Sequence, residues 1–495
     1  MSQLSRAQHG IWISTRTGAA TAYHMPLLIV LAEQPDHGAL AKACASLVER
    51  HPLLGSAVRE HDGVPRFEPA AVPPVLETGG SVDELVARPF DLEQGPLIRF
   101  ALVDQRTLVV VAHHLVFDGH SKDLLVSDLA AYYRGELPGD LRPAAPAPVG
   151  AADAAERAAE DAAEGAASFW AARWREPGAL ALPGGELRSR AAAGGGVVEF
   201  PLEIPLIGLT GFEVLVAAVH ALLGSYGNPD VATALDLSTR TAAESGRIGC
   251  HVNELPLFSK PSAETPFTVF ATELRGELRE TYRYRSVPLS RAVPGIRPHA
   301  ALAPVSISYR RTAQASWPGG EVEWLAFNHS VRGALQLQVV QGEPDAAGVA
   351  SAVASLRYDP REVTDPARFV ADLTALLAAI VGDPSRTLGE LREFDQAPQP
   401  SEDPGQQPRH PADGPPEPPA ASADDPLIAP IRAIWEQVLD LAPIDPHDDI
   451  FDLGGHSLTI TQIISRMQRQ LGVEISLDDF FENSTIAGVV AVVRG

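Results

Sequence analysis

The sequence predicts an α/β protein that ends in a separate all-α unit, and three observations lead to this prediction. The chain has 495 residues, which is too long for one ordinary core and indicates two or three folding units. From the start to about Phe394, short β-rich runs alternate with helical periodicities, which is typical of α/β folds. After a proline-rich stretch, the last 70 residues keep helical spacing only.

Four β-rich runs predict strands, at Leu27–Leu31, Leu108–Ala112, Val305–Ser308 and Leu335–Val340. A helix is predicted from about Leu40 to Glu49, because Leu40, Cys44 and Leu47 fall on one face. A second helix is predicted after Ser121, its expected N-cap, and Gly135 is expected to stop it.

Composition shifts divide the chain into four parts. Residues 139–150 are rich in Pro and Ala, and an Ala/Glu-rich helix follows them, so we predict two lobes, 1–150 and 151–395. Residues 396–425 contain nine prolines and almost no apolar side chains, so they cannot bury enough surface to fold and predict a flexible linker. Residues 426–495 predict a four-helix bundle. Its two long helices are marked by Ile428, Ile431, Ile434 and Trp435, and by Ile460, Ile463, Met467 and Leu471.

The bulk composition argues against several classes of protein. A hydrophobic content of 45% and a charged content of 21% are those of a globular protein. The net charge of -24 argues against nucleic-acid and membrane-surface partners. The two cysteines, Cys44 and Cys250, lie far apart, so we expect no disulfide framework and no metal site. Without a long apolar span or a signal-peptide pattern, a cytoplasmic protein is expected.

The motif Val110-Val-Ala-His113-His114-Leu-Val-Phe-Asp118-Gly119 lies at the end of an apolar strand. A neutral imidazole, with an ordinary pKa near ~6.5, can accept a proton at physiological pH. Because side chains alternate along a strand, only one of His113 and His114 can point into a given cavity. Taken alone, this spacing is equally compatible with a purely structural loop.

Ser457 follows Gly454-Gly455-His456 and stands where an amphipathic helix begins. The two glycines allow a tight turn there, and the positive end of a helix favours a phosphodiester. Taken alone, the pattern is also explained by a serine that only caps the helix.

Residues 426–495 resemble the peptidyl carrier domains of nonribosomal peptide synthetases. The motifs are Asp449-Ile-Phe-Asp452-Leu-Gly-Gly-His-Ser457-Leu, Gly472-Val-Glu-Ile and Phe480-Phe481-Glu-Asn-Ser-Thr485-Ile-Ala-Gly. The resemblance implies that Ser457 carries a covalent 4′-phosphopantetheine, added by a separate phosphopantetheinyl transferase. The thiol of this arm would hold an acyl group as a thioester.

Residues 1–395 resemble the condensation domains of the same synthetases, because five further motifs occur in the expected order. They are Leu4-Ser5-Arg-Ala7-Gln8-His-Gly-Ile11-Trp12 with Tyr23-His-Met-Pro26, Glu49-Arg50-His51-Pro-Leu53, Pro89-Phe90-Asp91-Leu92-Glu-Gln-Gly95-Pro96-Leu97-Ile-Arg99, the histidine motif, and Ile248-Gly249-Cys-His-Val252-Asn253-Glu-Leu255-Pro256-Leu257. The resemblance implies two chloramphenicol-acetyltransferase-like lobes and a tunnel that a carrier arm enters from each face.

The same resemblance implies a role for each residue of the motif. His114 would be catalytic, His113 and Asp118 would hold the shape of the loop, and Gly119 would allow the turn and leave room beside the substrate. Because a buried carboxylate needs a cationic partner, Arg240 is our candidate for an ion pair with Asp118. No metal is implied.

The chain departs from the family pattern at two places. His24 stands where an Asn commonly follows the Tyr, and Cys250-His251 replaces a Gly or Phe-type pair. We expect His251 to be a wall residue, and His9, His24 and His120 to be structural or surface residues.

The implied reaction is thioester aminolysis, which forms an amide between a group on an upstream donor carrier and an amine. The acceptor is expected on the chain's own arm. Because nothing here resembles the phosphate loop of an adenylation domain, a stand-alone adenylation enzyme is expected to load that arm in trans. Three alternatives stay open: ester formation, a freely diffusing acceptor, and a non-catalytic platform that recruits tailoring enzymes. Epimerisation is disfavoured, because such domains normally follow their carrier.

Overall fold

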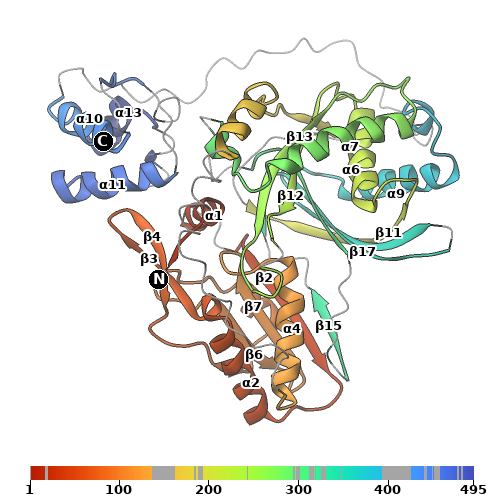
Figure 1. The fold of residues 1–495 in the computed structure, drawn as a ribbon, viewed down its shortest axis with the longest axis horizontal. Coiled ribbons are helices and arrows are strands. Elements are labelled where there is room, and N and C mark those ends of the chain that lie inside the picture. The colour runs from red at the N-terminus through yellow and green to blue at the C-terminus, as the bar shows by residue number, and fades with distance from the viewer. Residues whose placement is uncertain are drawn as a thin grey trace. The chain divides into compact units, whose positions relative to one another are not determined.

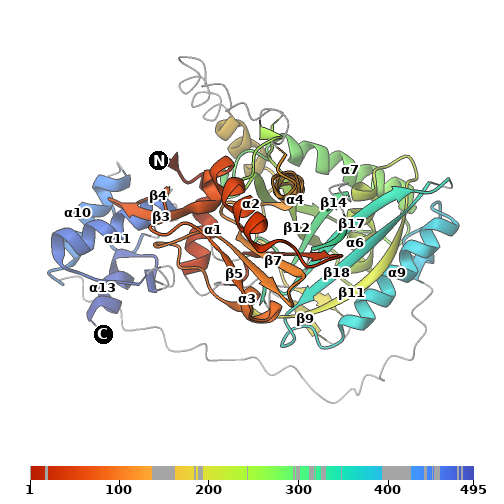
Figure 2. The same cartoon turned by 90° about the horizontal axis from the view of Figure 1, so that it is seen from below.

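The chain contains two main β-sheets with helices packed on them (Figures 1 and 2). One compact unit covers most of residues 1–391 and a second covers most of residues 392–495. The structure, a computed structural model, describes residues 2–16, 21–136, 162–182, 185–187, 193–241, 244–293, 296, 301–311, 317, 319–324, 330–346, 348–392, 425–439, 443–448, 450, 457–476, 479–480 and 483–494.

The first sheet has five strands in the order β15-β2-β7-β6-β5. Their bounds are His24–Leu31 for β2, Leu76–Thr78 for β5, Ile98–Val103 for β6, Thr107–His113 for β7 and Gly320–Trp324 for β15. Strand β7 pairs antiparallel with β2 on one side and with β6 on the other. The predicted strands at 27–31 and 108–112 are thereby confirmed. Residues 108–113 of β7 are all buried, which explains the unbroken apolar run of this strand.

The edge strand β15 comes from the second half of the chain. It pairs antiparallel with β2, with Glu321 opposite Val30. An unpaired edge would expose a row of backbone N–H and C=O groups, and β15 satisfies this row along β2. Residues 320–324, which belong to the predicted lobe 151–395, therefore complete the sheet of the predicted lobe 1–150.

Helices α2 (His37–Arg50) and α4 (Gly119–Tyr133) pack against each other beside this sheet (Figure 1). The predicted α2 face is buried at Leu40, Cys44 and Leu47. The predicted N-cap of α4 was wrong: the cap is Asp118, whose carboxylate accepts a hydrogen bond from the Ser121 amide, so the helix begins two residues before Ser121. A carboxylate at position 118 satisfies this amide from outside the helix, and Ser121 lies inside the first turn.

The second sheet has six strands in the order β11-β18-β17-β14-β12-β13. In chain order these strands are β11 (Gly196–Pro205), β12 (Val231–Ser238), β13 (Val252–Ser259), β14 (Val305–Arg311), β17 (Leu335–Pro344) and β18 (Val349–Tyr358). The predicted strands at 305–308 and 335–340 are confirmed. Helices α6 (Gly211–Ser225), α7 (Phe267–Arg283) and α9 (Pro366–Gly382) contact this sheet (Figure 2).

The remaining described elements of this unit are short. They are α1 (Arg6–Arg16), α3 (Val82–Ala87), α8 (Leu289–Ala292), the 3-10 turns Pro52–Gly55 and Glu390–Arg392, a helix over 162–171, and the strands β1 (Ser2–Gln3), β3 (Ser56–His61), β4 (Val64–Pro69), β8 (Leu180–Leu182), β9 (Gly185–Leu187), β10 (Ala193–Gly194) and β16 (Ser330–Val331). The helix over 162–171 agrees with the Ala/Glu-rich helix predicted before Phe169-Trp170.

The C-terminal unit is helical, as predicted. It contains α10 (Ile428–Leu439), α11 (Ser457–Leu471) and α13 (Ile486–Arg494). Trp435 stacks on Phe480 with ring centroids 5.7 Å apart, and both side chains are fully buried, so an aromatic pair anchors this small core. Most of the helix predicted at 477–482, and the linker 396–424, lie outside the described residues. None of the helices in the described ranges is both long and apolar enough to cross a membrane.

Candidate active site

His113 is the last residue of β7 and is fully buried. Its Nδ1 accepts a hydrogen bond from the Leu115 amide (3.2 Å), so Nε2 carries the ring proton and lies 3.4 Å from the Thr15 hydroxyl. Burial lowers the pKa of His113 well below its ordinary value, and the nearby His24 and His114 lower it further. His113 is therefore a neutral ring that holds the loop to α1.

His114 is half-buried and faces a different environment. Its Nδ1 lies 2.7 Å from the Phe117 carbonyl oxygen. Because a carbonyl oxygen can only accept, Nδ1 must carry a proton, and Nε2 is the nitrogen left to meet a substrate. The backbone adds a second restraint, since the His114 amide donates to the Tyr23 carbonyl (2.8 Å).

The charge state of His114 depends on its neighbours. Burial by itself lowers the pKa of this ring, but the neighbouring Cys250, the Asp118 carboxylate and the hydrogen bond to the Phe117 carbonyl raise it, to about 9 in total. The sulfur lies 3.8 Å from Nδ1. A ring with this pKa is mainly protonated at neutral pH, so Nε2 can donate a hydrogen bond there.

Asp118 and Arg240 form the ion pair that we predicted from the sequence. Arg240 Nη2 donates to Oδ1 (2.9 Å) and to Oδ2 (2.8 Å), and the two side chains are only 7% and 3% exposed for Arg240 and Asp118. Burial raises the pKa of Asp118, but the Arg240 charge and the hydrogen bonds from Ser121 lower it below its ordinary value overall. Asp118 is thus a fixed anion.

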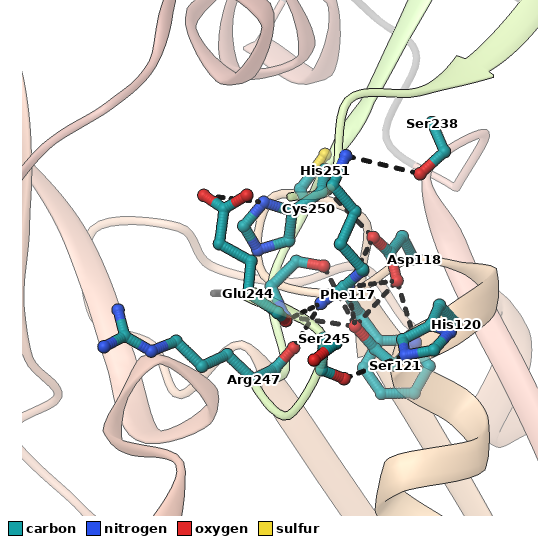
Figure 3. A network of polar contacts seen from close by, with 12 residues as sticks. Phe117, Asp118, His120, Ser121, Ser238, Glu244, Ser245, Arg247, Cys250 and His251 are labelled. Carbon is teal, nitrogen blue, oxygen red and sulfur yellow. Dashed lines mark hydrogen bonds and ion pairs between the residues drawn. The ribbon is translucent and has the colours of Figure 1, made fainter. Parts of the chain in front are cut away.

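The ion pair joins the start of α4 to the loop between β12 and β13. Figure 3 shows Asp118 from the start of α4 and His251 from this loop within one network of polar contacts. Arg240 Nη1 also donates to the carbonyls of Glu244 and Arg247, both at 2.6 Å. From the same loop, the His251 amide donates to Asp118 Oδ2 (3.0 Å) and the Gly249 amide donates to the Ser121 hydroxyl (3.1 Å). These contacts hold the loop against the histidine motif at several points.

Gly119 is the first residue of α4, and its backbone differs from the expectation. Its φ lies outside the left-handed region, so the turn itself does not require glycine. A Cβ added there would meet the Arg310 Cδ at 3.7 Å, which is ordinary van der Waals contact. The expected role in the turn is therefore wrong, and only the space beside the residue remains as an explanation.

Four further histidines have the surroundings of structural, surface or wall residues, as expected. His24 is buried with its Nδ1 2.7 Å from the Val86 carbonyl, and His9 packs on Trp12 with ring centroids 5.3 Å apart. His120 is exposed and its Nε2 lies 2.9 Å from the Ser245 carbonyl. His251 contributes its backbone amide to Asp118 and lines the same loop.

Sequence reasoning missed the residues that act through their backbone. The carbonyls of Phe117 and Tyr23 position His114, and no side-chain pattern announces such contacts. The contact between Cys250 and His114 was also missed, although the unusual Cys250-His251 pair was a signal that could have indicated it.

Ser457 is the first residue of α11, a 15-residue helix. The amides of a first helical turn have no partners within the helix and stand at the positive end of its dipole. A phosphodiester attached at this position would meet favourable charge, so the residue fits the implied arm. Residues 451–456 lie outside the described ranges.

Removing the Arg240 side chain should destabilise the unit that contains it. In Arg240→Met, the Asp118 carboxylate would stay buried without its cation, and breaking such a pair costs about 3–5 kcal/mol. Urea unfolding at pH 7 measures this. Because the folded-state pKa of Asp118 is depressed, its contribution is present above the unfolded pKa and is lost as the pH falls through the folded one.

Two controls accompany this measurement. The exposed pair of Arg88 and Glu77 offers a matched surface change, and Arg88→Met should have little effect. Adding Asp118→Asn to Arg240→Met should recover part of the loss, because it removes the stranded charge. An equal free energy of unfolding in Arg240→Met and wild type would contradict the stabilising role of the ion pair.

Comparison with known proteins gives two family matches. Residues 1–301 match the Condensation domain family, and residues 429–493 match the Phosphopantetheine attachment site family. The first match covers more than half of the chain.

Curated relatives are much longer proteins. Chondramide synthase cmdD of Chondromyces crocatus is 27% identical over 436 residues, which are 78% of this chain and 11% of that protein. The probable non-canonical nonribosomal peptide synthetase CymA of Salinispora arenicola is 30% identical over 335 residues, 60% of this chain and 4% of that protein. Tyrocidine synthase 3 of Brevibacillus parabrevis is 48% identical over 65 residues, 13% of this chain and 1% of that protein. The chain thus spans at most about a tenth of each of these relatives.

Solved structures share the fold. The first condensation domain of the calcium-dependent antibiotic synthetase aligns with a TM-score of 0.63 and 18% identity, over 79% of this chain and 98% of that one. The X-domain from teicoplanin biosynthesis aligns with a TM-score of 0.62 and 18% identity, over 78% and 96%. At this identity, the likeness establishes the two-lobed chloramphenicol-acetyltransferase-like fold.

Proposed function

Because the chain belongs to the condensation domain family and ends in a phosphopantetheine attachment domain, we propose that it joins two carrier-bound groups. The donor is an acyl or peptidyl thioester on an upstream carrier protein. The acceptor is the amino group of an aminoacyl thioester on the chain's own carrier domain. Condensation domains of nonribosomal peptide synthetases catalyse amide formation, and the carrier domain bears a covalent 4′-phosphopantetheine.

The observation that carries the proposal is the orientation of His114. With Nδ1 bonded to the Phe117 carbonyl, Nε2 is the ring nitrogen left to meet the reacting groups. As the amine attacks the acyl carbonyl carbon, the carbonyl oxygen gains negative charge, and a protonated Nε2 donates a hydrogen bond to it. The raised pKa of His114, about 9, favours this role over removal of a proton from the amine at neutral pH.

The bond changes balance without a protein nucleophile. The C–N bond forms, the C–S bond of the donor breaks, and the thiol of the donor arm leaves with one proton while the amine loses one. Stabilisation of this kind is worth about 10²–10³-fold in rate for one donor. Holding both reactants in one place contributes further, since tethering turns a bimolecular step into a unimolecular one.

The other motif residues hold His114 in place. The Asp118–Arg240 ion pair fixes the start of α4 and the loop that contacts the His114 ring, and His113 fixes the end of β7. These are positioning roles, because neither group is bonded to the His114 Nε2. For Gly119 we propose only the room beside the substrate that the resemblance implies, because a Cβ there would meet Arg310 at an ordinary contact distance.

Ser457 is the proposed attachment residue of the arm, and the thiol of the arm holds the aminoacyl group as a thioester when it is bound. A phosphopantetheinyl transferase would attach it. We propose that a stand-alone adenylation enzyme loads it in trans.

Intact-protein mass spectrometry tests this function. The chain is converted to its holo form, loaded with an amino acid by candidate adenylation enzymes, and mixed with an acyl-loaded donor carrier. The mass of the acyl group should leave the donor carrier and appear on this chain. Product released into solution would instead indicate a free acceptor, and transfer only to a hydroxy-acid acceptor would indicate ester formation. A donor that keeps its acyl group with every acceptor would favour the recruitment platform.

A further inference from the structure

Gln8 on α1 is hydrogen-bonded directly to the histidine motif. Its Nε2 donates to the carbonyl oxygen of Leu115, the residue after His114, over 2.8 Å. Both side chains are buried, with exposed fractions of 9% for Gln8 and 0% for Leu115. A buried backbone carbonyl needs a donor, and here a side chain 107 positions earlier in the chain supplies it.

The same side chain also caps the start of α1. Gln8 Oε1 accepts a hydrogen bond from the Ser5 amide (2.8 Å), and Ser5 Oγ accepts one from the Gln8 amide (3.2 Å), which together form a capping box. These contacts also fix the orientation of the Gln8 amide group. A flipped group would turn Nε2 toward an N–H donor and Oε1 toward a carbonyl oxygen, so only the orientation with Nε2 on Leu115 satisfies both partners.

A cap alone does not explain a glutamine at this position. Helices α3 and α6 begin with the same kind of capping box, and both use a glutamate, Glu84 and Glu213. A glutamate accepts the cap bond as a glutamine does, but an ionised carboxylate cannot donate to a carbonyl oxygen. The amide of Gln8 adds the donor that the Leu115 carbonyl requires.

Helix α1 meets the motif at a second point, which is His113. The Thr15 hydroxyl donates to the Ile11 carbonyl (2.8 Å), so its oxygen is left to accept the proton of His113 Nε2, 3.4 Å away. The residue before His114 and the residue after it are therefore both bonded to one helix. Trp12, only 2% exposed, anchors this helix in the core.

We propose that Gln8 is a positioning residue for the condensation reaction, which orients the His114 ring by holding the peptide group that follows it. The inference rests on the proposed function for its kinetic consequence, whereas the bond from Gln8 to Leu115 exists without it. The Leu115 carbonyl lies within the turn that ends at the Phe117 carbonyl, the acceptor of the His114 Nδ1 proton. Without its donor, this buried carbonyl would turn toward another partner and displace the turn and the ring with it.

The kinetic test uses two reciprocal variants of the capping box. Gln8→Glu keeps the cap but cannot donate to Leu115 when its carboxyl is ionised, whereas Ser5→Ala loses part of the cap and leaves the donor in place. The holo chain is loaded with its amino acid and mixed with an excess of acyl-loaded donor carrier at several concentrations. Intact-protein mass spectrometry then follows one acyl transfer per chain.

In Gln8→Glu at pH 8, the limiting rate constant should fall by about tenfold to hundredfold, because a small displacement of a reacting group costs that much. The donor-carrier concentration at half-maximal rate and the final extent of transfer should match wild type, whereas a partly unfolded variant would lower the extent. Gln8→Met, which cannot donate at any pH, should show the same loss. Ser5→Ala should keep the wild-type rate constant.

A structural test needs no activity. Hydrogen–deuterium exchange of the apo chain is measured by mass spectrometry on a peptide of residues 108–118, which includes the His114 amide bonded to the Tyr23 carbonyl. Loss of the buried hydrogen bond should speed exchange in this peptide by about tenfold in Gln8→Met and Gln8→Glu, but not in Ser5→Ala. A peptide from α9 is the control in the same molecule and should exchange at the wild-type rate in every variant.

Three results would overturn the proposal. They are a wild-type rate constant in Gln8→Met, an equal loss of rate in Ser5→Ala, which would place the effect in the helix start, and wild-type exchange of residues 108–118 in Gln8→Met. If circular dichroism shows that Gln8→Met does not fold, Gln8→Glu replaces it in each comparison, because its cap is intact. If wild type transfers no acyl group to any acceptor, the proposed function fails, and the exchange rates still decide whether Gln8 holds the motif.

Discussion

His114→Ala is expected to abolish the transfer of an acyl group from a loaded donor carrier to this chain. The substitution removes the proposed hydrogen bond from Nε2 to the developing oxyanion, and we expect a loss of at least about 10²–10³-fold in rate. Single-turnover mass spectrometry with both carriers loaded measures it, because substrate loading is then complete before the reaction starts. The Ser457 arm should still be attached and loaded normally.

A matched histidine provides the control for this experiment. His37 is exposed at the first residue of α2, remote in sequence from the motif, and His37→Ala should transfer at the wild-type rate. His114→Gln is a useful second variant, because its amide can occupy part of the space of the ring if alanine perturbs the loop. Undiminished transfer in both His114 variants would remove the catalytic assignment.

Ser457→Ala should eliminate both the attachment of phosphopantetheine and every later step. The alanine has no oxygen to form the phosphodiester, so the mass of the chain should be unchanged after incubation with a phosphopantetheinyl transferase and coenzyme A. Ser465→Ala, eight residues along α11, is the matched control and should gain the full mass of the arm. Attachment at wild-type level in Ser457→Ala would place the arm on another residue.

The effect of Ser457→Ala on stability should be small, which distinguishes loss of the arm from loss of fold. The carrier core is built from residues such as Ile431, Trp435 and Phe480, which are fully buried and remote in sequence from position 457. Circular dichroism of the variant should therefore match that of the apo wild type. A melted carrier domain would instead show that the serine also holds the helix start.

Much of the fold was accessible from the sequence because its signals are local. The apolar run that becomes β7 and the helical face at Leu40, Cys44 and Leu47 follow directly from periodicity. The start of α4 was misjudged, because Asp118 and Ser121 are both good capping residues and only the three-dimensional position of the carboxylate decides between them. The pairing of β15 with β2 joins residues about 290 positions apart, and nothing local encodes it.

The candidate site shows the same division. The roles in the histidine motif were predicted from its resemblance to condensation domains, and Arg240 was predicted because a buried carboxylate needs a cationic partner. The orientation of His114 was not, because it depends on the main-chain carbonyl of Phe117. The Cys250 contact joins two segments that meet only in the folded protein, and a lone cysteine in a sequence gives no indication of its neighbour.

The crossing strand β15 sets a limit on how this enzyme can be taken apart or recombined. Because residues 320–324 complete the sheet that begins with β2, a division near residue 150 does not separate the two sheets completely. A fragment that ends there would leave the β15-facing edge of β2 unpaired, and an unpaired strand edge is a template for aggregation between copies. Chimeras that exchange one half of the enzyme for another must therefore carry this short segment along with the half it serves.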